Sequence, residues 1–324
     1  AKLGGFTPPP PQLSLPEGLW RVLPGVFIGG GGLVDSFEKD RLANRTDLPA
    51  QKVLVQTGSK FASDLSKAQL DLLGGLAKAP LWWSLAWQDT KQRYRRSFLG
   101  PFWITVSTGV FVGAMGPLYG ALLGQDVTTY LQHVAISFII WTFISSSINE
   151  SGTAFIGAEG YIKQIALPLS VHILRLLSKN VLMLAHNALI IVLVLIFLPP
   201  AHWGSLWLLP FGLLLVLGNL FWIALLLAVL SARFRDIPQI VASVVQVAFF
   251  LSPIIWKADM LGPKNRFVAD FNPLYHFIEV IRAPLLGQPI HAVSWIVTAS
   301  LLVLGSIAAF LIFARLRARV PYWL

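Results

Sequence analysis

The sequence predicts an all-α integral membrane protein with six transmembrane helices, preceded by an amphipathic interface helix. Three observations point to this class. Hydrophobic residues make up 55% of the chain and charged residues only 12%, a balance unlike that of a soluble domain. Six apolar windows are each long enough to cross the hydrocarbon core, which takes about 20 helical residues. The lysines and arginines gather at alternate connections between these windows, as the two sides of a membrane require.

The predicted spans are separated by short polar connections, except before the last span. They cover residues 101–124, 130–149, 171–198, 206–229, 237–256 and 292–314. The connections after the first and third spans contain no lysine or arginine, whereas those after the second and fourth carry Lys163 and then Arg233 and Arg235. The tail at 315–324 is also basic. Because cytoplasmic loops collect these residues, both termini of a multi-pass protein are predicted to be cytoplasmic.

The region before the spans divides into two parts. Residues 1–80 form a predicted cytoplasmic extension that is partly of low complexity, with a helix expected at 59–76. Residues 81–100 form the predicted interface helix, with Trp83 and Trp87 on its aromatic face. Its cations suit the anionic headgroups of membrane lipids. They are Lys91, Arg93, Arg95 and Arg96.

The long outer connection at 257–290 carries secondary-structure signals of its own. Asn272 followed by Pro273 is a strong helix start, and Gly287 is a stop. Pro253 is expected to kink the end of the fifth span, because it removes a backbone donor. We therefore expect a short external helix that covers the outer mouth as a gate, with a simple solvent loop as the alternative.

Two predicted spans carry a stripe of polar and aromatic residues. One stripe lies on the fifth span and the other on the second: Gln239, Ser243, Gln246 and Phe250, and Ser137, Trp141 and Ser145. Polar side chains at membrane depth face protein or water, so the stripes either pack against each other or line a passage. Aromatic rings mixed with amides and hydroxyls would suit a sugar chain.

Several chemistries are not expected. No GxxxxGK motif followed by serine or threonine occurs, so the chain is not expected to hydrolyse ATP by itself. The spans contain neither metal-ligand spacing nor a carboxylate pair, which argues against a metal site, a catalytic constellation and proton-coupled transport. The net charge of +10 is explained by the sorting of cations across the membrane, and nucleic acid is not an expected partner.

Six segments, in order along the chain, resemble the membrane-spanning permease subunits of type-2 ATP-binding-cassette (ABC) exporters of O-antigen, capsular polysaccharide or teichoic acid. They are WQDTKQRYRRSFLGPFW at 87–103, YIKQIALPLSVHILRLLSKN at 161–180, ARFRDIPQIV at 232–241, LSPIIW at 251–256, FNPLYHFIEVIRAPLLG at 271–287 and RARVPYWL at 317–324. The chain departs from the pattern at Gln88, where the family has arginine.

The resemblance implies sets of functional residues, to which the polar stripes are added. Contacts with an ATPase are implied for Trp87, Asp89, Glu159, Tyr161, Ile162, Lys163 and Gln164. Channel lining is assigned to Ser137, Trp141, Ser145, Gln239, Ser243, Gln246, Phe249 and Phe250. An external gate is implied for Trp256, Asn272, Pro273, Tyr275, Glu279 and Arg282. Lys91, Arg93, Arg95 and Arg96 are expected to contact lipid and the pyrophosphate of the substrate.

The resemblance also implies a homodimer in the bacterial inner membrane that works with two separate ATPase subunits. ATP and magnesium would bind those subunits, since this chain has no nucleotide site and no expected cofactor. The substrate would be an undecaprenyl-diphosphate-linked polysaccharide, such as O-antigen, capsule or a similar glycan. Two alternatives stay open: an exporter of drugs or small lipids of the same type, and a membrane-embedded polyprenyl-phosphate glycan transferase.

Overall fold

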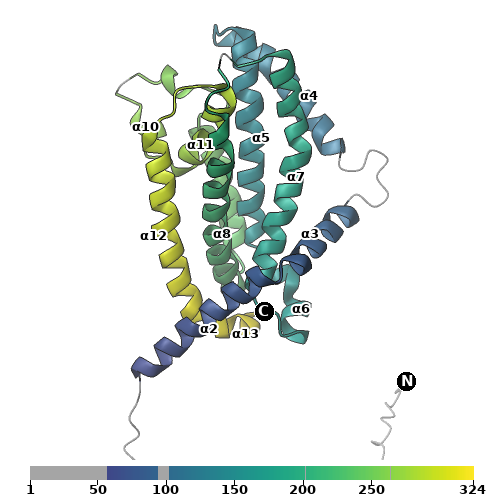
Figure 1. The fold of residues 1–324 in the computed structure, drawn as a ribbon, viewed down its shortest axis with the longest axis vertical. Helices are drawn as coiled ribbons and strands as arrows, with labels where there is room; N and C mark the ends of the chain where they lie inside the picture. The colour runs from purple at the N-terminus through teal and green to yellow at the C-terminus, as the bar shows by residue number, and fades with distance from the viewer. Residues whose placement is uncertain (1–56, 94–101, 201, 263) are drawn as a thin grey trace, which may run out of the picture. The chain divides into compact units, whose positions relative to one another are not determined.

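The protein is described by a computed structural model that covers residues 57–93, 102–200, 202–262 and 264–324. The secondary structure of these residues is entirely helical, and residues 56–324 form one compact unit. Figure 1 shows the long helices side by side, with α2, α6 and α13 at one end of the bundle and α10 and α11 toward the other. The fold is therefore the predicted all-α bundle.

Five helices in the described part of the chain are long and apolar enough to cross a membrane. They are α4 (Phe102–Leu122), α5 (Val127–Ser151), α7 (Ser170–Phe197), α8 (Leu209–Arg233) and α12 (Ala292–Leu316). Each lies within a few residues of a predicted span. The sequence predicts these five helices correctly, because hydropathy and length alone are enough to recognise a helix of this kind.

The remaining predicted span, 237–256, is shorter than expected. Its helix α9 (Ile237–Leu251) has 15 residues, or about 22 Å at 1.5 Å per residue. The helix ends because Pro253 disfavours helical backbone at the residue before it, and Ser252 is indeed extended with φ −92° and ψ 141°. Five helices thus meet the length requirement, and the count of six crossings stays a prediction.

The predicted helix start and stop in the outer connection are confirmed. Helix α11 (Pro273–Leu286) begins at Asn272, whose side chain accepts a hydrogen bond from the Leu274 amide at 3.0 Å. It ends at Gly287, which has a left-handed φ of 62°. The helix follows the short helices η4 (Ala258–Met260) and α10 (Phe267–Asp270). A simple solvent loop is therefore excluded.

Helix α11, which lies in the connection predicted to form the external gate, is buried within the bundle, and its role as a gate stays a prediction. All its residues from Tyr275 to Leu286 are buried, and the helix packs against α5, α8 and α12. The helix can be buried because most of its side chains are apolar and its two charged residues, Glu279 and Arg282, form an ion pair with each other. Close packing also explains Gly287, because a Cβ atom there would lie 2.1 Å from the carbonyl oxygen of His202.

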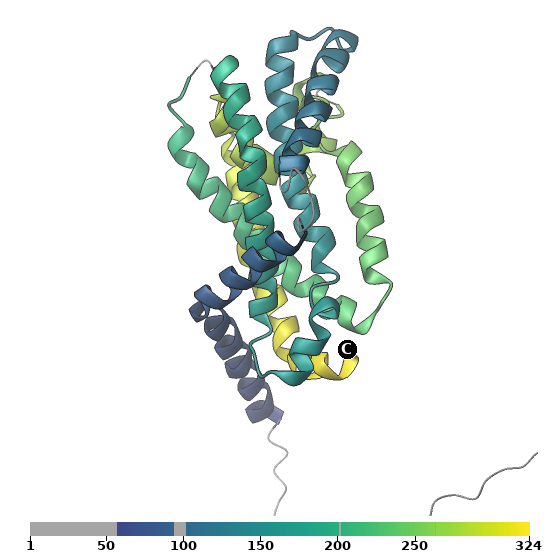
Figure 2. The same cartoon turned by 90° about the vertical axis from the view of Figure 1, so that its right-hand side faces the viewer.

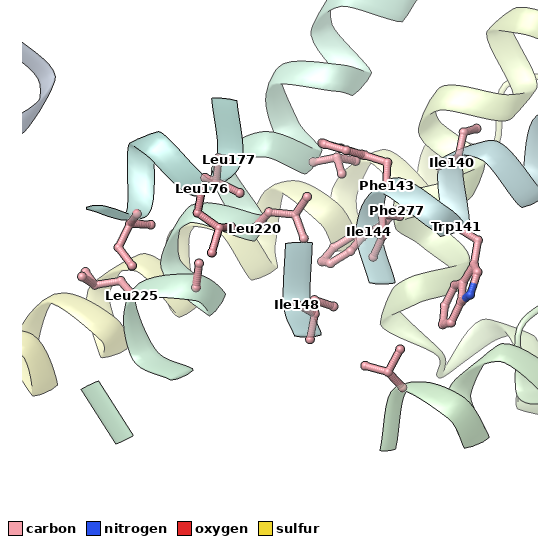
Figure 3. Packing of buried hydrophobic residues seen from close by; sticks show 14 of the residues in the cluster. Ile140, Trp141, Phe143, Ile144, Ile148, Leu176, Leu177, Leu220, Leu225 and Phe277 are labelled. Atoms are coloured by element: carbon pink, nitrogen blue, oxygen red, sulfur yellow. The ribbon is translucent and has the colours of Figure 1, made fainter. Parts of the chain in front are cut away.

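The core joins α5, α7, α8 and α11. Figure 3 shows side chains from these helices packed together, among them Phe143, Ile144, Leu176, Leu220 and Phe277. Helix α9 contacts α5 and α8 along one side, and Figure 2 shows it (light green) at the edge of the bundle. Its opposite side is open, which matters for the polar stripe that it carries.

Further helices, most of them short, surround the end of the bundle at which α5 and α8 finish. They are α2 (Thr57–Ala77), α3 (Ala79–Arg93), η2 (Ile156–Ala158), α6 (Glu159–Gln164), η5 (Arg317–Arg319) and α13 (Val320–Trp323), while η3 (Leu206–Leu208) precedes α8. Helix α2 matches the helix expected at 59–76. Helix α3 covers the first part of the predicted interface helix, and residues 94–101, with Arg95 and Arg96, lie outside the described residues.

Candidate functional site

The candidate ATPase-coupling residues lie mostly on α6, a short exposed helix. None of its residues is buried, and Tyr161 is 50% exposed. Lys163 donates a hydrogen bond of 2.7 Å to Glu159 one turn earlier, and this bond and the charge of Lys163 lower the pKa of the Glu159 carboxyl. Ile162 is half-buried and packs against the core. Helix α6 therefore projects from the bundle as a surface that a partner can contact.

Two further coupling candidates on α3 have different surroundings. Trp87 is 54% exposed, whereas Asp89 forms an ion pair with Arg175 of α7, with Nε 2.6 Å from Oδ2. Arg175 also lies over the ring of Tyr161, 5.9 Å from its centre. Arg175 thus connects α3, α6 and α7. Asp89 holds the helices in place, and Trp87 and α6 remain open to a partner.

The predicted pyrophosphate contacts are only partly described. Lys91 is exposed, and Arg93 donates to Glu150 of α5 at 3.1 Å. Glu150 is also bound by Lys179 at 2.8 Å and by the Asn180 amide at 3.0 Å, so its carboxylate ties α3 to α5 and α7. An open cavity of about 370 Å³ adjoins this network. Arg93 therefore carries a structural ion pair in addition to any ligand.

The two polar stripes are placed differently. On α9, Gln239, Ser243 and Gln246 are exposed in the single chain. On α5, Ser137 is fully buried and accepts a hydrogen bond of 3.0 Å from Arg282, and the half-buried Ser145 donates to the backbone of its own helix. The α5 stripe is thus used within the chain, and the α9 stripe is open.

Aromatic residues connect the two stripes. The ring centres of Trp141 and Phe249 are 5.7 Å apart, and those of Phe249 and Phe250 are 5.3 Å apart. Trp141 is buried, with 6% of its surface exposed, whereas Phe250 is 67% exposed. Of the predicted aromatic lining, Phe250 is therefore on the open face, and Trp141 supports it from behind.

The predicted gate residues form a bonded joint between α5, α9 and α11. Arg282 pairs with Glu279 inside the protein, and its Nη1 donates to the Pro253 carbonyl at 2.7 Å. Asn272 donates to the Ser252 hydroxyl at 2.9 Å, and Trp256 donates to the Phe250 carbonyl at 3.1 Å. The turn after α9 is thus bonded to α11.

A second cavity, of about 330 Å³, lies beside this joint. Its lining includes His133, Lys257, Tyr275, Glu279 and Arg282. Burial raises the pKa of Tyr275 to about 12, so its hydroxyl stays protonated at neutral pH. No group of three acidic or histidine side chains that could hold a metal ion occurs in the searched, described part of the chain.

Sequence reasoning missed the partners of several predicted residues. Arg175 and Lys179 lie near the start of a predicted span, where cations are explained by membrane topology, and Glu150 directly follows the end of another. The signal that could have found them is their spacing: Arg175 and Lys179 are four residues apart on one helical face, as expected for two cations that meet carboxylates on neighbouring helices.

Comparison with known proteins gives consistent relatives. The family described as ABC-2 type transporter matches residues 80–286, more than half of the chain. An O-antigen export system permease protein RfbA from Klebsiella pneumoniae is 25% identical over 201 residues, which cover 59% of this chain and 74% of the relative. A protein of the same name from Myxococcus xanthus is 22% identical over 205 residues, covering 62% and 78%.

Proposed function

Because the chain belongs to the ABC-2 type transporter family, we propose that it is the permease subunit of an ATP-driven polysaccharide exporter. Membrane subunits of this family are transport components, and membership implies a membrane setting and an ABC ATPase partner. The proposal adds that the substrate is a glycan linked to undecaprenyl diphosphate. The name of the relatives, O-antigen export system permease, supports this substrate class.

The observation that carries the proposal is the open polar stripe of α9. Gln239, Ser243 and Gln246 are exposed on a helix of otherwise apolar composition. Amide and hydroxyl groups are costly against lipid, so this face requires protein or water beside it. A second copy of the chain would cover the stripe and leave a passage between the two subunits.

The chemistry of the same face suits a sugar chain. Phe250 offers an exposed ring to the apolar face of a pyranose, and the two glutamines offer both donors and acceptors to hydroxyl groups. A passage for drugs or small lipids would have no need of such amides. We therefore favour a polysaccharide over those substrates.

The end of the bundle that carries α6 would receive the ATPase subunits. The exposed α6 and the exposed Trp87 are the contact surface in this proposal, and Arg175 joins them to α3 and α7. ATP and magnesium would bind the partner. The lysines and arginines near α6 and α13 support a cytoplasmic location for this end, and for both chain termini, under the positive-inside rule. Lys91 and Arg93, with Arg95 and Arg96, would meet lipid headgroups and the diphosphate.

A transport assay with variants of the open face tests the proposal. The chain and its ATPase are reconstituted in vesicles, and ATP-dependent movement of an undecaprenyl-diphosphate-linked glycan is measured. We expect Gln239→Leu with Gln246→Leu to reduce export about tenfold or more, and the matched change Val244→Leu on the apolar side of α9 to leave it unchanged.

The alternatives give different results in the same assay. If the double glutamine variant exported the glycan as well as Val244→Leu does, the proposal that α9 lines the passage would be contradicted. Transport of drugs or short lipids in place of the glycan would identify the other type of exporter. Covalent transfer of the glycan to an acceptor, without ATP, would identify a transferase.

A further inference from the structure

Asp71 of α2 binds the beginning of α7 through four hydrogen bonds. Its side chain is fully buried. Oδ1 accepts from the Ser170 amide at 3.0 Å and lies 2.9 Å from the Ser170 hydroxyl, which also donates to the Asp71 carbonyl at 2.7 Å. Oδ2 accepts from the Leu169 amide at 3.1 Å. The N-cap of α7 is Leu169, which has no capping side chain of its own, so Asp71 supplies the cap from another helix.

The same carboxylate also binds the end of α12. Arg317 donates from Nε to Oδ2 at 2.8 Å, so one buried charge joins α2, α7 and the segment that follows α12. A second contact lies nearby, where the Arg315 guanidinium stacks over the Phe61 ring at 5.5 Å. Removing any one partner would leave a buried charge or donor unmatched, which is more costly than losing an exposed pair.

Helix α2 approaches α7 closely because it carries glycine at the contact. A Cβ atom at Gly75 would lie 2.1 Å from the Ser170 hydroxyl oxygen and 3.0 Å from the Ser170 Cβ. A Cβ at Gly74 would touch Pro168 at 3.5 Å. Residues 168–170 are therefore held from two sides, by hydrogen bonds to Asp71 and by packing against the glycines.

The position of this junction along the chain gives it a mechanical consequence. Only residues 165–169 separate the end of α6 from the start of α7. This short segment links α6 directly to Ser170. Both Asp71 and Arg317 lie outside residues 80–286, the part that the ABC-2 family matches. The junction thus adds two outer segments of this chain to the predicted coupling surface.

We propose that Asp71 is a positioning residue that makes α2, the α6–α7 junction and the end of α12 move as one rigid unit. Through it, displacement of α6 by the ATPase is passed to α7 and α12 together, and α6 cannot swing on its own. This inference rests on the proposed function, because it assigns a role in coupling ATP hydrolysis to export.

The substitution Asp71→Asn tests the role with little change of shape. It replaces one carboxylate oxygen by an NH₂ group, which would face donors at either position. Asp64→Asn, the same change two turns earlier on α2, is the matched control. We expect the Asp71 variant to assemble with the ATPase and hydrolyse ATP within about twofold of wild type, while glycan exported per ATP falls about tenfold, within the range of measured coupling energies.

Equal loss of export, ATP hydrolysis and assembled complex would show that Asp71 only stabilises the fold, and would overturn the proposal. Normal export by Asp71→Asn would overturn it as well. The Asp64 variant is expected to behave as wild type in every measurement.

Hydrogen exchange separates this inference from the substrate assignment. With ATP and the ATPase but no glycan, we expect the change in protection at 165–172 to appear also at 57–77, and to disappear from 57–77 in Asp71→Asn. Vesicles that export no glycan but show this linked change would contradict the proposed substrate alone. Independent changes in the two segments of wild type would contradict the role of Asp71.

Discussion

Arg282 shows what a buried charge requires of its surroundings. Its guanidinium pairs with Glu279 and donates to Ser137 and to the Pro253 carbonyl, so that its donors are used inside the protein. Both side chains of the pair are nearly inaccessible, at 4% and 6% exposure. Removing one partner of such a pair strongly destabilises the folded protein, although replacing both partners with apolar residues is often tolerated.

This asymmetry predicts the outcome of a mutant cycle. We expect Arg282→Met alone to reduce the free energy of unfolding by about 3–5 kcal/mol, and the double change Arg282→Met with Glu279→Met to recover most of the loss. Arg266→Met is the control, since its contacts with Asp259 and Asp270 are exposed and longer, at 3.6 and 3.7 Å; its effect should stay below about 1 kcal/mol. Unfolding in mixed micelles measures all three. A double variant no more stable than Arg282→Met alone would contradict the account.

Single residues also show which features of the site could be predicted from the sequence and which could not. The capping pair Asn272–Pro273 and the glycine at 287 define α11 by local chemistry alone, and both were predicted correctly. The partners of Asp71 and Asp89 were not predicted, because they lie on helices about 100 and 86 residues away. Nothing in the local pattern of a carboxylate names the distant donor that it will meet.

At the scale of elements, hydropathy overestimates the length of α9 and does not predict the burial of α11. Hydropathy extends α9 to 256, but Pro253 and the turn bonded to Asn272 end the helix at Leu251. Hydropathy and length exclude α11 as a span, yet its many apolar side chains and its internal Glu279–Arg282 pair allow it to lie inside the bundle. A window average cannot separate these cases, since both depend on which neighbours the helix meets.

Two glycines with the same backbone angle differ in how closely the protein packs around them, so they allow the effect of packing on stability to be measured. Gly124 and Gly287 both have φ of 62°, but a Cβ at Gly124 would meet open space, whereas one at Gly287 would lie 2.1 Å from the His202 carbonyl oxygen. Alanine at either site should cost about 1–2 kcal/mol for the left-handed backbone.

Gly287→Ala should cost clearly more than Gly124→Ala, because the loop before α8 must also move. Thermal unfolding of the two variants measures the difference, with a lower midpoint expected for Gly287→Ala. Equal midpoints would show that the contact with His202 yields without cost.

At the scale of the whole molecule, the two ends of the bundle have separate roles. One end holds the exposed α6, the basic helix ends and the Asp71 junction, and the proposed ATPase contact lies there. The other end holds α11 and its buried ion pair. Between them, α9 leaves polar side chains open on the edge of the bundle. Composition predicted the spans, but it could not predict which face of α9 would lack a partner within the chain.

The central claim is that the open stripe of α9 lines an aqueous, glycan-conducting passage in the assembled transporter. Because the chain has no cysteine, Ser243→Cys on the stripe and Val244→Cys on the apolar side can each be labelled alone with a membrane-impermeant maleimide. In vesicles with the ATPase and ATP, we predict that cysteine at 243 reacts, that lipid-linked glycan slows this reaction, and that cysteine at 244 stays unreactive. Equal, glycan-independent labelling at the two positions would contradict the account.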